Sequence, residues 1–145
     1  MPLVFTYGPD AVVGRMSDRI VGTRFIGTAL LLDHRLVFDK PNVKKKGEGL
    51  PNLKADAGAK VFGLVFEVPA QHMELLDGFY GGYGRKPVKV SMKGEEMDAD
   101  SWFARRTAPR LKPSKQTIAE TKRGLEENAA PRAFIEELDG IEVLA

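Results

Sequence analysis

Two short segments of this chain carry side chains that could act on a small molecule. They contain Tyr7, Gly8, Pro9, Asp10 and Ala11 in the first, and Tyr80, Gly81, Gly82 and Tyr83 in the second. A phenol titrates at about pH 10, so at neutral pH it donates hydrogen bonds and is a poor base. Paired glycines let a backbone pass close to a ligand or reverse direction. These segments are the candidate site, although simple packing explains Tyr83 equally well.

The sequence predicts neither a metal ion nor a cofactor. Its two histidines, His34 and His72, lie far apart in the chain, and it has no cysteine. Protein zinc sites are built mainly from clustered histidines and cysteines. The glycine-rich phosphate loop and the nucleophile elbow are also missing. The lack of cysteine further excludes disulfides and thiolate chemistry.

The composition is that of an ordinary globular protein. Hydrophobic residues make up 43% and charged residues 29% of the 145 residues, which suits one domain with one core. No apolar run approaches the roughly 20 residues that span a bilayer, and no secretory signal pattern occurs. We therefore expect a single domain over residues 1–145 that is cytoplasmic, has no membrane partner, and is a monomer or a homodimer.

Positive charge is concentrated in two segments, although the net charge is only +2. One segment is Lys44–Lys46, and the other contains Arg105, Arg106, Arg110, Lys112 and Lys115. Such clusters can hold phosphates, but solvated loops look the same in a sequence. No aromatic residues that could stack on bases are interleaved with them, which argues against a nucleic-acid partner.

Apolar and alternating runs predict strands over residues 2–7, 61–68, 88–92 and 98–104. Residues 20–38 predict a hairpin that turns at Asp33 and His34. Residues 39–58 are polar and predict a long loop with a short strand near Leu53, followed by a turn over residues 57–60.

Helical patterns predict a short helix after Pro69 that ends at Gly78, and two longer helices near the C-terminus. The first of these covers residues 117–128 with Ser114 as a plausible N-cap, and the second begins at Pro131. Residues 11–18 could form a helix or a loop. The whole pattern predicts an α+β fold, in which helices flank a mixed sheet that can curl into a barrel. Residues 113–145 are predicted to form a C-terminal helical extension.

Four sequence pieces, in this order and spacing, resemble the γ-glutamylcyclotransferase-like family. They are Phe5-Thr6-Tyr7-Gly8, residues 17–39 with Val21-Gly22-Thr23, Pro51-Asn52 followed by residues 58–66, and Leu76-Asp77 followed by Tyr83. Each piece alone is weak, but four in order are fairly specific. The resemblance covers nearly the whole chain and implies a small mixed β-barrel of about five to seven strands with helices around it.

The resemblance also implies a reaction. Members of the family act on γ-glutamyl amines or peptides and release 5-oxoproline and a free amine. The α-amine of the substrate attacks its own γ-carbonyl, so the nucleophile is already tethered and the protein mainly has to fold the substrate into the reactive shape. A glutamate with a raised pKa moves the proton from the ammonium to the leaving amine.

The resemblance places this chain's candidate residues in family roles, with two departures. Tyr7 and Gly8 match the start of the family's substrate loop, whose backbone amides receive the substrate. Here the loop continues with Pro9, which has no N–H, and Asp10, which would repel an anionic substrate. The catalytic glutamate of the family falls on Tyr80, which is the second departure. Tyr83 matches a family tyrosine that follows the catalytic segment.

Three functions remain open on the sequence. The first is a γ-glutamyl cyclotransferase that forms 5-oxoproline, with Tyr80 or a displaced carboxylate (Asp77, Glu67 or Glu48) in place of the usual acid and base. The second is a catalytically impaired family member that binds a small ligand. The third is an interaction role through the basic segments. Fold resemblance argues for the first, and the residues at the site argue for the second.

Overall fold

The computed structural model describes residues 1–145, and five strands in it close into a barrel in the order β1-β3-β2-β4-β5. The strands are β1 (Leu3–Thr6), β2 (Arg24–Pro41), β3 (Gly49–Glu67), β4 (Tyr83–Met92) and β5 (Glu95–Ala104). Neighbouring strands are antiparallel except β1 and β5, which pair in parallel at Val4 and Asp100. The predicted small mixed barrel with flanking helices is confirmed.

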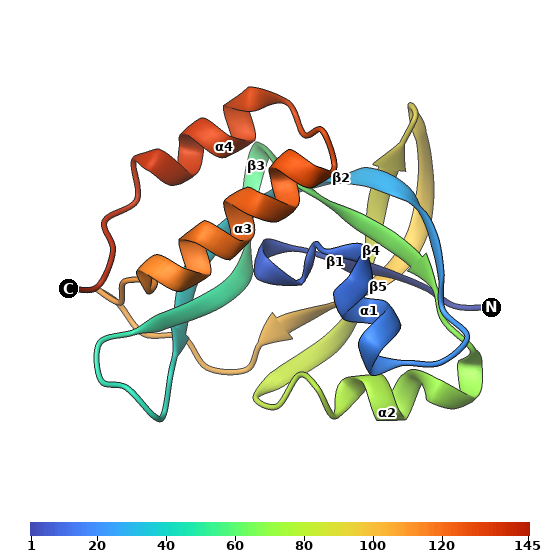
Figure 1. Cartoon of the computed structure of the whole chain (residues 1–145), viewed down its shortest axis with the longest axis horizontal. Coiled ribbons are helices and arrows are strands. Elements are labelled where there is room, and N and C mark those ends of the chain that lie inside the picture. The colour runs from blue at the N-terminus through green and yellow to red at the C-terminus, as the bar shows by residue number, and fades with distance from the viewer.

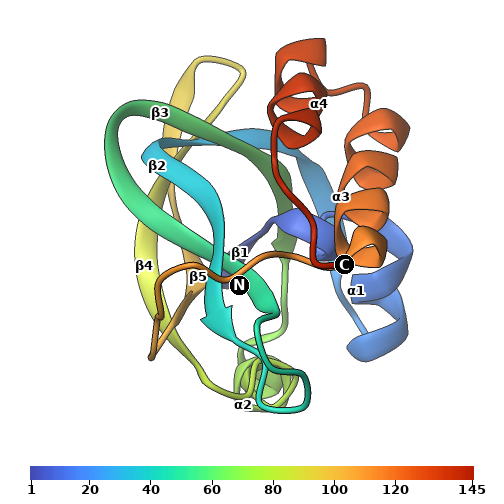
Figure 2. The same ribbon diagram turned by 90° about the vertical axis from the view of Figure 1, so that its left-hand side faces the viewer.

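Helices surround the barrel on two sides (Figures 1 and 2). They are the 3₁₀ turn η1 (Gly8–Asp10), α1 (Val13–Arg19), the 3₁₀ turn η2 (Ala70–His72), α2 (Met73–Asp77), α3 (Lys115–Glu127) and α4 (Arg132–Asp139). Helices α3 and α4 form one layer next to β2 and β3, whereas α2 lies at another side of the barrel, as Figure 2 shows. No helix is both long and apolar enough to cross a membrane.

Alternate residues of the same strand face different apolar clusters, because successive side chains of a strand point to opposite faces. Phe5 and Val65 lie inside the barrel, while Val4 and Leu64 belong to the cluster beneath α1 and α2. A third cluster joins the barrel to the C-terminal helices, and Phe62 contributes to it. The near-continuous apolar run at the end of β3 is therefore buried on both faces.

Gly63 allows β1 to approach β3 closely. A Cβ atom at this position would lie 2.3 Å from the carbonyl oxygen of Thr6 and 2.5 Å from the Phe5 ring. Only glycine leaves room for this contact. The position of β1, and of the segment from Tyr7 onward, therefore depends on it.

The strands predicted over residues 2–7, 61–68, 88–92 and 98–104 are confirmed. The hairpin turn predicted at Asp33 and His34 is wrong. Strand β2 runs through Asp33, which adopts φ 58° at a register shift and accepts a hydrogen bond from the Gly58 amide at 3.0 Å. Asp33 tolerates this backbone, and a bulge bends a strand without ending it.

Most of the predicted long loop is also strand. Strand β2 continues to Pro41, and β3 begins at Gly49, so only residues 42–48 connect them. Residues 57–60, predicted as a turn, lie inside β3. The polar residues of this region misled the prediction, because the outer part of a two-stranded ribbon faces water and carries polar side chains.

The predicted helices are confirmed. Gly78 caps α2, and Pro69 precedes the 3₁₀ turn that leads into it. The hydroxyl of Ser114 accepts a hydrogen bond from the Thr117 amide at 3.0 Å, as expected of an N-cap. Residues 11–18, left open by the sequence, include most of helix α1.

Candidate functional site

The two candidate segments meet at a small cavity near the end of β1. Its volume is about 170 Å³. It is lined by Phe5, Thr6, Tyr7, Pro9, Asp10, Pro51, Phe79, Tyr80, Tyr83 and Trp102. Strand β1 delivers the first residues, the turn after α2 delivers Phe79 and Tyr80, and β5 delivers Trp102. The structure thus brings together Tyr7, Pro9, Asp10, Tyr80 and Tyr83, while Gly8 and Ala11 face a different cavity.

Aromatic rings form the walls of this cavity. The rings of Tyr80 and Trp102 are stacked, with centroids 4.2 Å apart and planes 11° apart. Tyr83 meets Tyr80 edge to face at 6.1 Å. The guanidinium group of Arg19 lies 5.3 Å from the Phe79 ring centroid and 5.7 Å from that of Tyr80. Such contacts fix the rings in place.

Hydrogen bonds fix the phenols of Tyr7 and Tyr83. Tyr7 donates to the carbonyl oxygen of Trp102 at 2.6 Å, and Tyr83 donates to the carbonyl oxygen of Pro51 at 2.7 Å. The indole Nε1 of Trp102 donates to Asp77 at 2.9 Å. Tyr83 therefore both packs against its neighbours and lines the cavity. The carboxylate of Asp77 is occupied by its hydrogen bond with Trp102.

All three tyrosines of the chain line this cavity. Burial raises the pKa of Tyr80, and the nearby Asp10 carboxylate raises it further against the opposing effect of Arg19. Burial likewise raises the pKa of Tyr83 and of Tyr7. A buried phenolate is costly because its charge loses water. The three phenols are therefore neutral at physiological pH.

Asp10 is the carboxylate of this cavity, and two arginines neutralise it. Its Oδ1 atom lies 3.2 Å from Arg15 and 3.2 Å from Arg19, both on α1. Arg15 also contacts Glu120 on α3 at 3.5 Å. The expected repulsion of an anionic substrate by Asp10 is therefore reduced, because the neighbouring guanidinium groups offset its charge. The spacing of Arg15 and Arg19, one helical turn apart after Asp10, could have indicated this cluster.

Two backbone amides that follow Tyr7 donate hydrogen bonds inside their own segment. The amide of Asp10 donates to the carbonyl oxygen of Tyr7 at 3.2 Å, and the amide of Ala11 donates to that of Gly8 at 3.1 Å. Pro9 has no N–H to offer. The short 3₁₀ turn thus leaves few backbone donors for a ligand.

Thr6 supplies a polar group that the sequence did not single out. Thr6 is 2% exposed and lines the cavity, and its hydroxyl has no hydrogen-bond partner. A buried hydroxyl without a partner costs free energy. A ligand in the cavity could provide the missing partner.

A scan against known families matches residues 4–122 to the gamma-glutamyl cyclotransferase, AIG2-like family. This span contains the barrel and most of α3.

The chain belongs to this family.

Solved structures of similar fold agree with the assignment. A structure described as a gamma-glutamyl cyclotransferase has 26% identity and a TM-score of 0.87, with 98% of this chain and 88% of that chain covered. An uncharacterized protein from Homo sapiens has 27% identity and a TM-score of 0.84 over the same shares. YkqA from Bacillus subtilis has 16% identity and a TM-score of 0.80, and the match covers 99% of this chain and 56% of the YkqA chain. This match shows the fold alone. A comparison with curated proteins finds no match.

The structure also joins the two basic segments of this family member. Residues 44–46 are exposed in the β2–β3 connection, and a bridge pairs Glu48 with Lys112 beside it. Lys112 is itself neutralised by Glu142 at 2.8 Å. The interaction role of these segments stays a prediction.

Proposed function

We propose that this protein binds a γ-glutamyl compound or 5-oxoproline in the cavity of Tyr80 and Trp102, and that its ring-closing activity is impaired. The observation that carries the proposal is the Tyr80 phenol, which lies in the cavity at the position that the resemblance assigns to the family's glutamate. Stacking on Trp102 and a raised pKa keep this group a neutral phenol.

The reaction of the family needs a proton carrier that a neutral phenol does not provide. In ring closure the α-nitrogen forms a bond to the γ-carbonyl carbon, and the amide bond to the leaving amine breaks. The α-ammonium loses two protons when it becomes the lactam N–H, and the leaving nitrogen gains two when it departs as an ammonium, so nothing is oxidised or reduced. A general base works best with a pKa near the working pH. Tyr80, whose pKa is raised above the ordinary value, accepts such a proton poorly.

Three features support binding of a small polar ligand at the same place. The cavity of about 170 Å³ is smaller than the roughly 300–1,000 Å³ of pockets for drug-sized molecules, so a ligand of the size of one amino acid suits it. The Thr6 hydroxyl is unsatisfied. Arg19 lies at the aromatic wall, paired with Asp10 at 3.2 Å, and its guanidinium group has further N–H donors that a ligand carboxylate can use.

A second candidate is an active γ-glutamyl cyclotransferase in which Asp10 replaces the glutamate. This candidate is favoured by the position of Asp10, which lines the same cavity and acts on Tyr80. Both arginine contacts involve its Oδ1 atom, and its carboxylate also acts on the Tyr80 hydroxyl.

Incubation with a panel of γ-glutamyl amines and peptides, followed by mass-spectrometric measurement of 5-oxoproline, tests both candidates. We expect the wild-type protein to form little product and Tyr80→Glu to form more, because a carboxylate can carry the proton. Tyr80→Gln, which has nearly the shape of glutamate without its charge, should stay at the wild-type level. Fast turnover by the wild type that disappears in Asp10→Asn would instead establish the second candidate.

Binding is tested separately with 5-oxoproline. We expect it to change the emission of Trp102, the single tryptophan. Failure of 5-oxoproline and of every γ-glutamyl compound to bind would overturn the proposal even if no turnover were found.

We further propose that residues 1–145 form one domain, because the C-terminal helices share cores with the barrel. Phe62 of β3 and Phe134 of α4 lie 5.8 Å apart, and Asn128 at the end of α3 donates to the carbonyl oxygen of Ala11 at 3.3 Å. The cytoplasmic location and the monomeric or homodimeric state stay predictions.

A further inference from the structure

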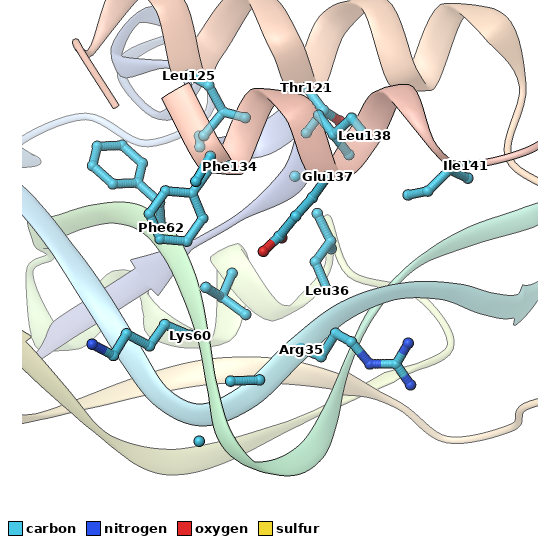
Figure 3. Close-up of a pocket in the computed structure, with 16 residues that line it drawn as sticks. Arg35, Leu36, Lys60, Phe62, Thr121, Leu125, Phe134, Glu137, Leu138 and Ile141 are labelled. Carbon is cyan, nitrogen blue, oxygen red and sulfur yellow. The ribbon is translucent and has the colours of Figure 1, made fainter. Parts of the chain in front are cut away.

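A second cavity lies between the C-terminal helices and the long ribbon of β2 and β3 (Figure 3). Its volume is about 660 Å³, within the roughly 300–1,000 Å³ range of small-molecule pockets. Apolar side chains dominate its walls, among them Leu36, Phe62, Leu125, Phe134, Leu138 and Ile141. It is separate from the cavity of Tyr80, although η1 borders both: Gly8 lines the larger cavity, and Pro9 lines the smaller.

Glu137 is an exposed residue of α4 that lines this cavity, together with the charged residues Arg35 and Lys60. Figure 3 shows its carboxylate pointing from α4 toward the apolar walls, while the charged ends of Lys60 and Arg35 extend away from it on opposite sides. Arg35 is engaged with Asp56 at 3.3 Å. Neither basic group forms an ion pair with Glu137.

The lack of an ion-pair partner distinguishes Glu137 from its acidic neighbours. Glu136 pairs with Arg132 at 3.6 Å, Asp139 pairs with Lys122, and Glu142 pairs with Lys112 at 2.8 Å. Glu137 is exposed, so water solvates its carboxylate in the free protein, and an ammonium group on a ligand would add a charge-assisted hydrogen bond there.

We propose that this cavity binds an amphipathic primary amine, with its ammonium group on Glu137 and its apolar body against Phe62, Phe134 and Leu138. The two phenyl rings, 5.8 Å apart, add favourable contacts for an aliphatic or aromatic body and for the cation itself. An amphipathic carboxylate fits less well, since Glu137 repels it and the basic groups point outward. This inference does not depend on the proposed function of the smaller cavity.

Titration of the full chain with 2-phenylethylamine and with hexylamine, followed by heteronuclear NMR, tests the proposal. We expect saturable shifts of Phe62, Phe134 and Leu138 resonances at millimolar amine. The matched acids, 3-phenylpropionate and hexanoate, should bind more weakly. Glu137→Gln should weaken amine binding by roughly three- to tenfold, while Glu136→Gln, which removes a neighbouring carboxylate outside the cavity, should leave it unchanged.

Ala133→Trp provides a second variant, because Ala133 is exposed and lines the cavity. The larger side chain should block the cavity and abolish the amine-induced shifts without removing any charge. The proposal is overturned if the matched acids bind as well as the amines, if Glu137→Gln binds amine like the wild type, or if the shifts map to Tyr80 and Trp102 instead.

Discussion

Tyr80 and Trp102 lie parallel, with 4.2 Å between their ring centroids, although 21 positions separate them in the chain. Asp77 holds the indole through Nε1, and the Tyr7 hydroxyl bonds to the Trp102 carbonyl oxygen. Four residues from three separate parts of the chain thus define one wall of the cavity. The side chain predicted to stand in place of the family's glutamate is part of that wall.

Removal of the Tyr80 ring should expose one face of the single tryptophan. We expect Tyr80→Ala to lower the free energy of unfolding by about 2 kcal/mol and to shift the Trp102 emission to longer wavelength. Phe79→Ala is the matched control, because Phe79 is the neighbouring aromatic residue, is 47% exposed and has no ring contact with Trp102. Equal emission shifts in both variants would contradict the stacked arrangement.

The phenols should ionise at higher pH in the folded protein than in the denatured chain. The pKa values of Tyr7, Tyr80 and Tyr83 are raised by burial, so the unfolded state loses these protons first as pH rises. Stability should therefore be complete below about pH 10 and fall above it, by about 1.4 kcal/mol per pH unit for each phenol.

Absorbance of tyrosinate at high pH measures this difference without interference, because the chain has no other tyrosine. The protein in denaturant should titrate at about pH 10, and the folded protein should show the signal only together with unfolding. Ionisation of the folded protein at the denatured value would refute the buried placement of the three rings.

Loss of the Asp77 carboxylate should destabilise the wall through Trp102. We expect Asp77→Ala to lower the free energy of unfolding by about 1–3 kcal/mol, since the buried indole N–H loses its acceptor. Asp98→Ala removes an exposed carboxylate that pairs with Lys89 at 3.0 Å and should cost less than about 1 kcal/mol. Chemical denaturation measures the free energy of unfolding of both variants and of Asp77→Asn. The asparagine keeps an acceptor oxygen, so Asp77→Asn should lose less stability than Asp77→Ala.

Replacement of the Thr6 hydroxyl by a methyl group should separate stability from binding. Thr6→Val removes a buried polar group without a partner, so we expect unchanged or higher stability. Affinity for 5-oxoproline should fall. Thr121→Val is the control, because the Thr121 hydroxyl donates to the Thr117 carbonyl oxygen at 2.7 Å and its loss should not raise stability. A clear loss of stability in Thr6→Val would show that the hydroxyl has a structural partner.

Two helical glycines should respond in opposite directions to alanine. In Gly124→Ala the added Cβ would lie 2.6 Å from the Ala11 carbonyl oxygen, and the clash of about 1–3 kcal/mol outweighs a helix-propensity gain of about 1 kcal/mol. Gly14 has no atom within 4 Å of such a Cβ, so Gly14→Ala should stabilise by about 0.5–1 kcal/mol. Thermal unfolding of both variants tests the close contact of α3 with η1.

Local patterns in the sequence were sufficient for the elements whose ends carry their own signals. Ser114 marks the start of α3, Gly78 the end of α2, and the apolar run over residues 61–68 the end of β3. The prediction failed for the ribbon of β2 and β3, because these residues become strand through pairing with each other and not through their own residue types. Asp33 and Gly58 have the residue types of a turn, and only the register between the strands makes them a bulge.

The sequence by itself determined the family and the order of most elements, because residue types and spacings are local information. Tertiary structure alone decided that Tyr80 stacks on Trp102, that α1 supplies two arginines to Asp10, and that Glu137 lines an apolar cavity without a partner. These relations depend on how a closed barrel and its helices bring distant residues together. Charge, burial and missing partners are properties of that arrangement, so no single segment carries them.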